Sequence, residues 1–386
     1  MVIGALATAW RLWQSIAVRV LGFMTGTSLD AVDMAVIETD GDEITGLGPA
    51  GEKKLDPGVR RLLEAAIGDA LKLKEGDPTP ASFGVAAQAM AEEHIAAGDA
   101  FMRDNGLLPG DIELIGLQGQ TVLHAPPGPD RPEGRTIQLI DAPAVARALA
   151  APTVYDLRQD DVAAGGQGAP LAPIYHAALV RYSGLHVPMA VLNLGGVANL
   201  TLIRSDGELE AFDTGPGVGM IDLVVQDRTD RRYDEDGKLA RAGQANERAL
   251  NAYLSDPYFQ RRGPKSLDRF DFRLDRVVAM TLPDAAATLT AFTAEAVWRG
   301  LQACSEIPLR VVVTGGGRHN PALMDAIRGV CPLPVLTAED VHWRGDSIEA
   351  EAFAFLAARS MMALPISFPG TTGVPAPLTG GRIAMP

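Results

Sequence analysis

The sequence predicts an α/β protein made of two halves with similar structure. Short apolar runs typical of strands alternate with longer segments in which apolar residues recur at helical spacing. A strand–glycine turn–strand pattern at residues 21–37 recurs at 189–203, which indicates a structural duplication. The chain of 386 residues is long enough for two or three domains. We place the boundary near residue 150, giving domains at 1–150 and 151–386, and the last helix, 346–364, can return to the first.

The first half begins with a hairpin whose strands, 15–24 and 31–40, flank the sequence TGTSLD. Helices are predicted from about residue 57 to 73 and from about 80 to 104. A buried strand and a polar turn follow within 112–122. A strand at 135–140, a helix at 141–150 that Asp141 can cap, and a strand at 152–158 complete this half. The last strand leads into the loop QDDVAAGGQGAP.

The second half repeats the hairpin at 189–204 and continues with a strand and a glycine-rich turn at 208–217. A helix starts at 218, and the polar stretch 228–276 is predicted to hold short helices and loops. A strong helix at 284–304, a strand–glycine turn–helix at 309–330 and a final helix at 346–362 follow. The turn-rich tail, 368–381, is expected on the surface.

Composition excludes several classes of protein. The net charge of −14 makes nucleic acid and anionic membranes poor partners, and 47% hydrophobic with 21% charged residues excludes bulk disorder. Two distant cysteines fit idle thiols in a reducing cytoplasm. No apolar run reaches the length of a membrane span, and residues 1–20 lack the pattern of a signal peptide.

Three glycine turns can bind phosphate, because their backbone N–H groups are free to face an anion. They are Gly26-Thr27-Ser28, followed by Asp30 and Asp33; Gly195-Gly196, flanked by Asn193 and Asn199; and Gly315-Gly316-Gly317 before a helix. Each alone can be an ordinary tight turn. Together, two hairpins could clamp the phosphates of a nucleotide and the third turn could seat the adenosine. The chain has no Walker A motif, and GPGVGM matches the dinucleotide fingerprint only in part.

Seven ordered blocks resemble the anhydro-N-acetylmuramic acid kinases. They are GFMTGTSLDAVD, GLQGQTVLH, DLRQDDVAAGGQGAPLAP, NLGGVANLT, FDTGPG, TGGGRHNP and DSIEAEAFAFLA, and the resemblance covers about residues 20–380. It implies the two-domain actin-like/hexokinase-like ATPase fold, with an active-site cleft between duplicated domains. It also implies a bacterial cytoplasmic enzyme of cell-wall recycling. From 1,6-anhydro-N-acetylmuramic acid, ATP and water, such an enzyme makes N-acetylmuramic acid 6-phosphate and ADP.

The resemblance assigns Asp161 as the base that activates water, with Asp156 and Asp160 as the alternative acids. Glu349 matches a position near the sugar, although Asp346 and Glu349 could instead form a capping box. The remaining residues expected at the sugar are Gln120, Thr121, His124 and Arg158.

ATP and Mg²⁺ are the cofactors that the resemblance implies. Asp30, Asp33 and Asp213 are expected to hold Mg²⁺ directly or through water, although Asp30 and Asp33 could instead cap the turn. The expected nucleotide-binding residues are Gly26, Thr27, Ser28, Leu29, Asp30, Ala31, Val32, Asp33, Gly195, Gly196, Asn199, Gly315, Gly316, Gly317 and Asn320. The segment 264–272 departs from the family's pattern; within it, Lys265 could meet a carboxylate of the substrate.

Two other functions remain open. A plain hexose or amino-sugar kinase would use the same fold without consuming water. A nucleotide-driven binding module would need no sugar site, and the Asp-containing loop DDVAAGGQGAPL argues against it. The expected partner is a small-molecule sugar, with neither nucleic acid nor membrane, and a homodimer is left open.

Overall fold

The chain folds into two compact units in a computed structural model that describes residues 17–26, 29–74, 77–128, 131, 133–267 and 271–386. The first unit runs up to Gly184 and resumes at Ser347–Pro386, and the second is Leu185–Asp346. These units divide at residue 184, whereas the sequence predicted a boundary near 150, because β7 (Thr153–Tyr155), α5 (Gln159–Ala163) and α6 (Pro173–Tyr182) belong to the first unit. The final helix, α12 (Ile348–Met361), returns to the first unit, as the alternative expectation had it.

The sheet of the first unit has the order β13-β7-β4-β1-β2-β3. Strands β1, β2 and β3 pair antiparallel, β4 and β7 continue beside β1 in parallel, and β13 pairs antiparallel with β7. A separate hairpin joins β5 (Gln120–Ala125) to β6 (Arg135–Leu139). The main strands are β1 (Val18–Thr25), β2 (Ala31–Thr39), β3 (Ile44–Lys54), β4 (Leu114–Leu117), β7 (Thr153–Tyr155) and β13 (Arg382–Ala384).

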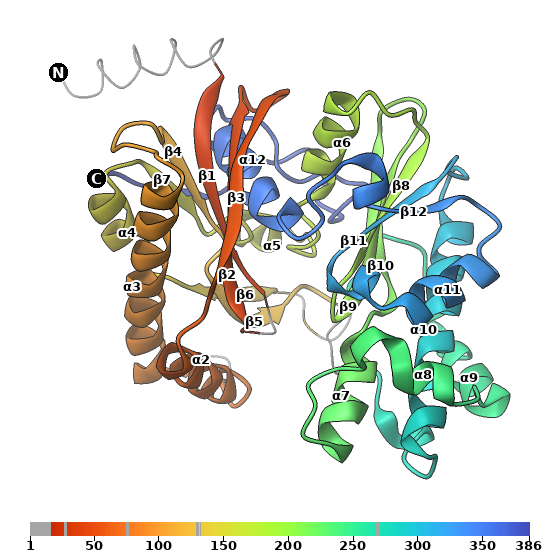
Figure 1. Cartoon of the computed structure of the whole chain (residues 1–386). Coiled ribbons are helices and arrows are strands. Elements are labelled where there is room, and N and C mark those ends of the chain that lie inside the picture. The colour runs from red at the N-terminus through yellow and green to blue at the C-terminus, as the bar shows by residue number, and fades with distance from the viewer. Residues whose placement is uncertain (1–16, 27–28, 75–76, 129–130, 132, 268–270) are drawn as a thin grey trace. The chain divides into compact units, whose positions relative to one another are not determined.

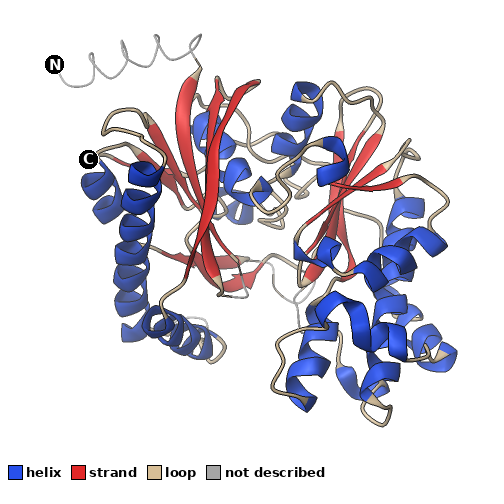
Figure 2. Cartoon of the chain, viewed as in Figure 1, coloured by secondary structure: helices blue, strands red, loops and turns tan. Residues whose placement is uncertain are grey.

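The sheet of the second unit repeats this arrangement in the order β10-β9-β8-β11-β12. The first three strands of this unit, β8, β9 and β10, pair antiparallel, and β11 and β12 continue in parallel on the other side of β8. Numbered by their order in the chain within each sheet, the first five strands of both sheets are therefore arranged 3-2-1-4-5. The predicted α/β class and the predicted duplication are therefore confirmed (Figures 1 and 2). The strands are β8 (Met189–Leu194), β9 (Val197–Ile203), β10 (Leu209–Pro216), β11 (Val311–Thr314) and β12 (Val335–Thr337).

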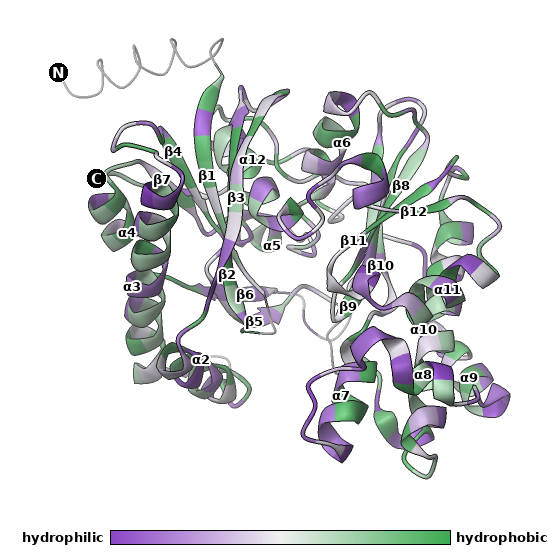
Figure 3. Ribbon diagram, in the orientation of Figure 1, coloured by the Kyte–Doolittle hydropathy of each residue, from purple (hydrophilic) through white to green (hydrophobic). Residues whose placement is uncertain are grey.

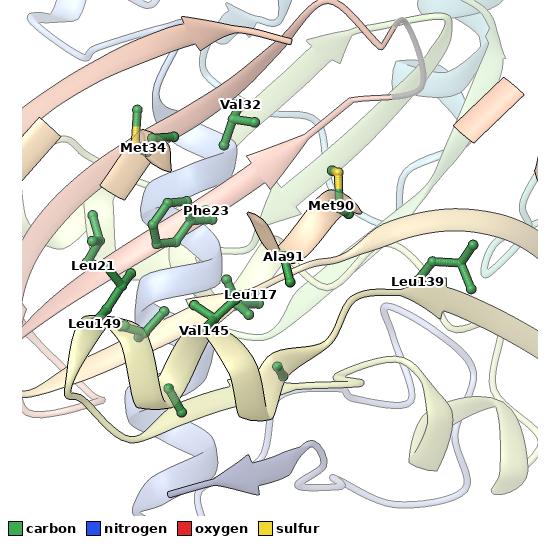
Figure 4. Packing of buried hydrophobic residues seen from close by; sticks show 14 of the residues in the cluster. Leu21, Phe23, Val32, Met34, Met90, Ala91, Leu117, Leu139, Val145 and Leu149 are labelled. Carbon is green, nitrogen blue, oxygen red and sulfur yellow. The ribbon is translucent and has the colours of Figure 1, made fainter. Parts of the chain in front are cut away.

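Helices cover both faces of the first sheet. On one face, side chains of α3 and α4 pack against the strands, as Met90, Val145 and Leu149 do against Leu21 and Phe23 (Figure 4). Asp141 caps α4 as predicted, because its Oδ1 accepts a hydrogen bond from the Ala144 N–H at 3.1 Å. These helices are α2 (Pro57–Ala70), α3 (Ala81–Asp104), α4 (Ala142–Leu149), α5 (Gln159–Ala163) and α6 (Pro173–Tyr182).

Helix α12 lies directly on the opposite face of this sheet. Gly22 of β1 and Gly116 of β4 are register partners, and neither has room for a side chain. A Cβ at Gly22 would be 1.9 Å from the Ala350 carbonyl oxygen, and one at Gly116 would be 2.2 Å from that of Phe353. Two glycines thus let the helix backbone approach the strands and fix the position of its first turn, which carries Glu349.

The second unit has its core around α10 and α11, which pack on the apolar side of β8 and β11. Figure 3 shows β8 as a largely hydrophobic strand. The described residues of the polar stretch, 228–267 and 271–276, form short helices and loops as predicted. The helices are α7 (Gly219–Arg228), α8 (Lys238–Ala242), α9 (Glu247–Leu254), α10 (Leu282–Ala303) and α11 (Pro321–Val330). Across the described parts of the chain, no helix is long and apolar enough to cross a membrane.

Two buried histidines make the stability of the first unit depend on pH. Burial lowers the pKa of His94 and of His176 to about 4. The unfolded chain therefore binds more protons than the folded one between about pH 6.5 and 4, so stability falls as the pH falls through that window. Each histidine is expected to cost roughly 2 kcal/mol of unfolding free energy between pH 7 and pH 5.

Denaturant unfolding at several pH values tests this expectation. His94→Gln and His176→Gln should each flatten the fall in stability below pH 6.5. His186→Gln, at an exposed position, is the matched control and should leave the slope unchanged. A wild-type protein equally stable at pH 7 and pH 5 would contradict the expectation.

Candidate active site

Asp161 lies on the short helix α5, between strand β7 and the glycine-rich loop. The sequence predicted that this aspartate lies in a loop directly after the strand. That prediction was wrong, because a short helix forms there. The turn forms because the Val162 N–H reaches the Arg158 carbonyl at 3.1 Å, and because the Ala164 N–H reaches the carbonyls of Asp160 and Asp161. The helix directs Asp160 and Asp161 to different partners.

The Asp161 carboxylate is only 1% exposed and is held by one donor on each oxygen. Its Oδ1 accepts a hydrogen bond from the Gly168 N–H at 2.5 Å. Its Oδ2 accepts one from the Thr372 hydroxyl, also at 2.5 Å. A buried carboxylate is stable in its ionised form only where such donors compensate for lost hydration.

The loop after α5 closes tightly around this carboxylate. A Cβ at Gly166 would lie 2.2 Å from Asp161 Oδ1, and Gly168 has a φ of +68°, which favours glycine. Gly166 is therefore required by the close approach of the backbone to Asp161. Gly165 and Gly168 are instead favoured by their positive φ values of +92° and +68°.

Arg158 brings a positive charge to the same carboxylate. Its Nη1 donates a hydrogen bond to the Gly168 carbonyl at 2.7 Å. Burial lowers the pKa of Arg158 below its usual range, and the charges of Glu349 and Asp161 act in the opposite direction. Arg158 thus interacts electrostatically with the predicted base, Asp161, and with the predicted sugar-site residue Glu349.

Glu349 is the second residue of α12, and its side chain is exposed. The alternative capping box is wrong, because the N-cap residue is Ser347 and no side chain caps this helix. Asp346 instead accepts a hydrogen bond from Arg318 at 2.9 Å. Desolvation raises the pKa of Glu349, and the charge of Arg158 acts in the opposite direction.

The hairpin β5–β6 presents a row of polar side chains beside α5. His124 Nδ1 lies 3.1 Å from the Thr136 hydroxyl, and the Gln138 side-chain amide donates to that hydroxyl at 2.6 Å. Gln120 is 1% exposed, and its Oε1 has no hydrogen-bond partner. Thr121 Oγ1 accepts a longer bond, 3.4 Å, from Gln138. Sequence reasoning named Gln120, Thr121 and His124, whereas it missed Thr136 and Gln138.

Hydrophobic packing anchors the first glycine turn. Thr27 and Ser28 lie outside the described residues, but Gly26 and Leu29 are joined by a hydrogen bond of 3.2 Å from the Leu29 N–H. Leu29 and Val32 are buried in the core, so their side chains are not available to a nucleotide.

The two acids of this turn have different surroundings. The Asp30 carboxylate forms an ion pair with Arg60 at 3.5 Å. Asp33 lies on β2 in register with Glu52, and Ala31 begins that strand. Asp30 is therefore partly neutralised by a neighbouring cation.

The Gly195–Gly196 turn rests on a second glycine-rich turn. The Val218 N–H donates to the Gly195 carbonyl at 2.9 Å, and the Gly217 N–H donates to that of Gly196 at 3.0 Å. A Cβ at Gly217 would lie 2.1 Å from the Gly195 carbonyl oxygen, whereas a Cβ at Gly196 meets nothing within 4 Å. The turn is thus supported on one side and open on the other.

Polar residues line up next to this turn. Asp213, Asn199, Asn193 and Thr314 are register partners across β10, β9, β8 and β11. Directly opposed residues share one face of a sheet, so these side chains form one row.

The third turn begins with Gly315, which has a φ of +76° and leaves no space for a side chain against Asn193. Gly316 and Gly317 open a short 3₁₀ turn, Gly316–His319. Asn320 caps α11, because its Oδ1 accepts a hydrogen bond from the Leu323 N–H at 3.1 Å. Its side chain thus has a structural role alongside the predicted nucleotide contact.

Asp213 is the most strongly perturbed carboxyl of the second unit. Burial raises its pKa to about 7, despite a 2.7 Å hydrogen bond from the Leu267 N–H and the nearby charge of Lys265. Burial also lowers the pKa of Lys265 to about 8. The Lys265 ammonium donates to the Tyr258 carbonyl at 3.1 Å and lies 4.1 Å from the centre of the Tyr258 ring.

Lys265 and Leu267, within the divergent segment 264–272, therefore support Asp213, a role that the sequence did not reveal. Lys265 is only 5% exposed, so the expectation that it meets a substrate carboxylate has no support in its surroundings. Within the part of the chain that the structure describes, no group of three or more His, Cys, Asp or Glu could hold a metal ion. A cation here would need ligands from a substrate or from water.

A family model described as anhydro-N-acetylmuramic acid kinase matches residues 18–385. The chain is 57% identical over 368 residues to the anhydro-N-acetylmuramic acid kinase of Phenylobacterium zucineum, covering 95% of this chain and 100% of that one. It is 57% identical over 365 residues to that of Caulobacter vibrioides, covering 95% and 98%. It is 45% identical over 378 residues to that of Methylobacterium nodulans, covering 95% and 100%.

Solved structures are more distant. An activator of 2-hydroxyisocaproyl-CoA dehydratase from Clostridium difficile, with bound ADPNP, aligns at 12% identity and a TM-score of 0.41, covering 89% of this chain and 95% of that one. An inorganic polyphosphate/ATP-glucomannokinase from Arthrobacter aligns at 12% identity and a TM-score of 0.37, covering 89% and 98%.

Proposed function

The chain belongs to the anhydro-N-acetylmuramic acid kinase family, and we propose that it performs the family's reaction with Asp161 as the base. It is an ATP-dependent phosphotransferase of peptidoglycan recycling, and its two-domain fold is the actin-like/hexokinase-like ATPase fold. Its substrate is the anhydro-sugar that names the family. The observation that carries the proposal is the buried Asp161 carboxylate, held by two hydrogen bonds beside the charge of Arg158.

Asp161 accepts a proton from water as the water oxygen bonds to the anomeric carbon of the sugar. The bond from that carbon to the bridging 6-oxygen breaks, and the 6-oxygen takes the γ-phosphoryl group as ADP leaves. The proton on Asp161 then passes to solvent, so the reaction releases one proton. Asp161 thus serves both bond changes, because opening the bridge creates the phosphoryl acceptor.

The sugar is recognised by polar groups of the first unit. Glu349, Arg158, Gln120, Thr121 and His124 supply donors and acceptors for hydroxyl and amide groups. The unsatisfied Oε1 of the buried Gln120 is the feature that favours this role, since leaving it unpaired costs free energy that a ligand donor would recover.

Phosphates are bound by backbone N–H groups of the glycine turns. In the first unit these belong to the turn at Gly26-Thr27-Ser28, and residues 29–33 hold that turn in place. In the second unit they belong to the turns at Gly195–Gly196 and Gly315–Gly317, with Asn199 and Asn320 beside them. Phosphoryl transfer is mainly a matter of position and charge, which such turns supply.

Asp213 fits Mg²⁺ better than Asp30 does. Mg²⁺ is usually bound by one or two carboxylates together with phosphates and waters. Asp213 is a carboxyl that burial makes costly to ionise, a cost that a cation would offset, whereas Asp30 already pairs with Arg60. Bound there, Mg²⁺ would neutralise phosphate charge. Asp33 remains a second candidate.

A cytoplasmic location is part of the proposal, because the reaction consumes ATP and the two cysteines, Cys304 and Cys331, are free thiols. The substrate is a small molecule, and a homodimer stays a prediction.

The role of Asp213 predicts a pH dependence. Because its pKa is raised to about 7, the carboxyl is mostly neutral below that pH. The kcat/KM for MgATP should therefore fall about tenfold per pH unit below pH 7. Asp213→Asn should lower kcat/KM at pH 8 and remove this slope. Asp206→Asn, on the exposed β9–β10 connection, should change neither, and a slope retained in Asp213→Asn would exclude the role.

The proposed function is tested by incubating the purified protein with Mg-ATP and 1,6-anhydro-N-acetylmuramic acid. Mass spectrometry and phosphorus NMR should identify N-acetylmuramic acid 6-phosphate, formed with one equivalent of ADP. Phosphorylation of N-acetylglucosamine but not of the anhydro-sugar would favour a plain sugar kinase. A rate of ATP hydrolysis that does not change when any sugar is added would favour a nucleotide-driven binding module.

A further inference from the structure

The segment after α12 is not the surface tail that its turn-rich sequence suggests. Ser367, Thr371, Thr372 and Val374 are each at most 2% exposed. The segment ends in β13, which pairs with β7 immediately before α5. It therefore packs into the first unit around the helix that carries Asp161.

Two hydrogen bonds attach Thr372 to the loop and to the carboxylate. Its carbonyl accepts a bond from the Gln167 N–H at 2.7 Å. Its hydroxyl donates to Asp161 Oδ2 at 2.5 Å, and the residue is 0% exposed. Thr372 thus bonds both to the catalytic carboxylate and to the loop whose Gly168 holds the other oxygen.

The same segment also holds the neighbouring acid. Arg382 forms a bidentate ion pair with Asp160, with distances of 2.8 and 2.9 Å, and the Gly381 N–H donates to Asp160 Oδ2 at 3.2 Å. The two adjacent acids of α5 are therefore both bound by residues more than 200 positions later in the chain. The C-terminal segment is thus bonded to α5 at two adjacent residues.

We propose that Thr372 is a positioning residue for Asp161, fixing the carboxylate and favouring its ionised form through the hydrogen bond to Oδ2. The inference rests on the proposed role of Asp161 as the base. A hydrogen bond to the charged form of an acid favours that form, and the effect is strongest where water is excluded. Without the hydroxyl, the carboxylate would keep only the Gly168 donor and would be free to turn about its side-chain bond.

Thr372→Val replaces the hydroxyl by a methyl group of similar size. It should lower kcat by about 10- to 100-fold, the range typical of groups that orient a reactive ligand. KM for ATP should stay unchanged, because Asp161 is not among the residues proposed to bind the nucleotide. The acid limb of the pH profile of kcat should move to higher pH, since the ionised base is less favoured.

Two matched variants separate positioning from folding. Thr372→Ser keeps the donor and should restore most of kcat and the wild-type pH profile. Thr371→Val removes a buried hydroxyl that bonds only locally, to Phe368 at 3.2 Å, and should leave both unchanged. A structural role for the segment would instead make both valine variants alike in melting temperature and activity.

Asp161→Asn, measured in the same series, distinguishes the two claims. Suppose that Asp161→Asn is inactive, while Thr372→Val and Thr371→Val have equal kcat and equal pH profiles. The inference about Thr372 is then wrong, and the proposed role of Asp161 as the base is retained. If Asp161→Asn retains wild-type kcat, the proposed base itself is wrong. A shifted acid limb in Thr372→Val alone, restored by Thr372→Ser, establishes Thr372 as the positioning residue.

Discussion

Replacing Asp161 by asparagine is expected to lower kcat by about 10²- to 10⁴-fold, the contribution typical of a general base. Asparagine has nearly the same shape and its oxygen can still accept the Gly168 N–H, but it cannot take a proton from water. The Thr372 hydroxyl can rotate to accept from the new amide. The variant should therefore fold normally and retain wild-type affinity for ATP.

Steady-state kinetics and thermal unfolding of Asp161→Asn check this prediction. The matched control is Asp160→Asn on the same helix, which breaks an exposed ion pair with Arg382 and should cost at most about 1 kcal/mol of stability. If Asp160→Asn lost activity while Asp161→Asn kept it, the base would be Asp160 and not Asp161.

The second large effect is expected at the turn that supports Gly195 and Gly196. Gly217→Ala would place its Cβ 2.1 Å from the Gly195 carbonyl oxygen, so one of the two turns must shift. Such overpacking costs about 1–3 kcal/mol. Because the phosphate-binding N–H groups move with the turn, KM for ATP should rise at least about tenfold.

Two other glycines test the cause of that rise. Gly196→Ala meets no atom within 4 Å, so it should leave the melting temperature unchanged while its methyl group occupies the open side where phosphate is proposed to bind. KM for ATP should therefore still rise. Gly329→Ala in α11, also without a neighbour within 4 Å, should change neither. Unchanged KM in Gly196→Ala would place the phosphates elsewhere.

The fold was largely predictable because its signals are local. Each hairpin is encoded by two apolar runs and the glycine turn between them, so β1–β2 and β8–β9 could be placed from the sequence. The shared strand order of the two sheets, by contrast, depends on parallel pairing between distant strands. The return of α12 to the first unit depends on its close packing against Gly22 and Gly116, which no local pattern encodes.

A site residue could be predicted only where the residues next to it in the sequence form a recognisable pattern. The Asp161 carboxylate precedes a glycine-rich loop, and the structure shows that Gly166 is needed there because the backbone closely approaches that carboxylate. Thr372 lies 211 residues away, within a segment whose composition is typical of a surface turn. Its contact with Asp161 could not be read from the sequence.

Capping illustrates how one local pattern can have two outcomes. Asp141 caps α4 as predicted, because its side chain is free to turn back to the Ala144 N–H. Asp346, in an equally good pattern, instead pairs with Arg318, a long-range partner with a full charge. The stronger charged interaction decides the outcome, and only the tertiary structure supplies it.

The central claim is that water attacks the anomeric carbon while the 6-oxygen takes the phosphoryl group, with Asp161 as the base for that water. The most direct test is to run the reaction in ¹⁸O-water with Mg-ATP and 1,6-anhydro-N-acetylmuramic acid and to measure the mass of the sugar product by mass spectrometry. The claim predicts one phosphate and one ¹⁸O atom in the product, the ¹⁸O located at the anomeric carbon, and a correspondingly slow formation of product by Asp161→Asn. A phosphorylated sugar formed without the heavy oxygen would contradict it.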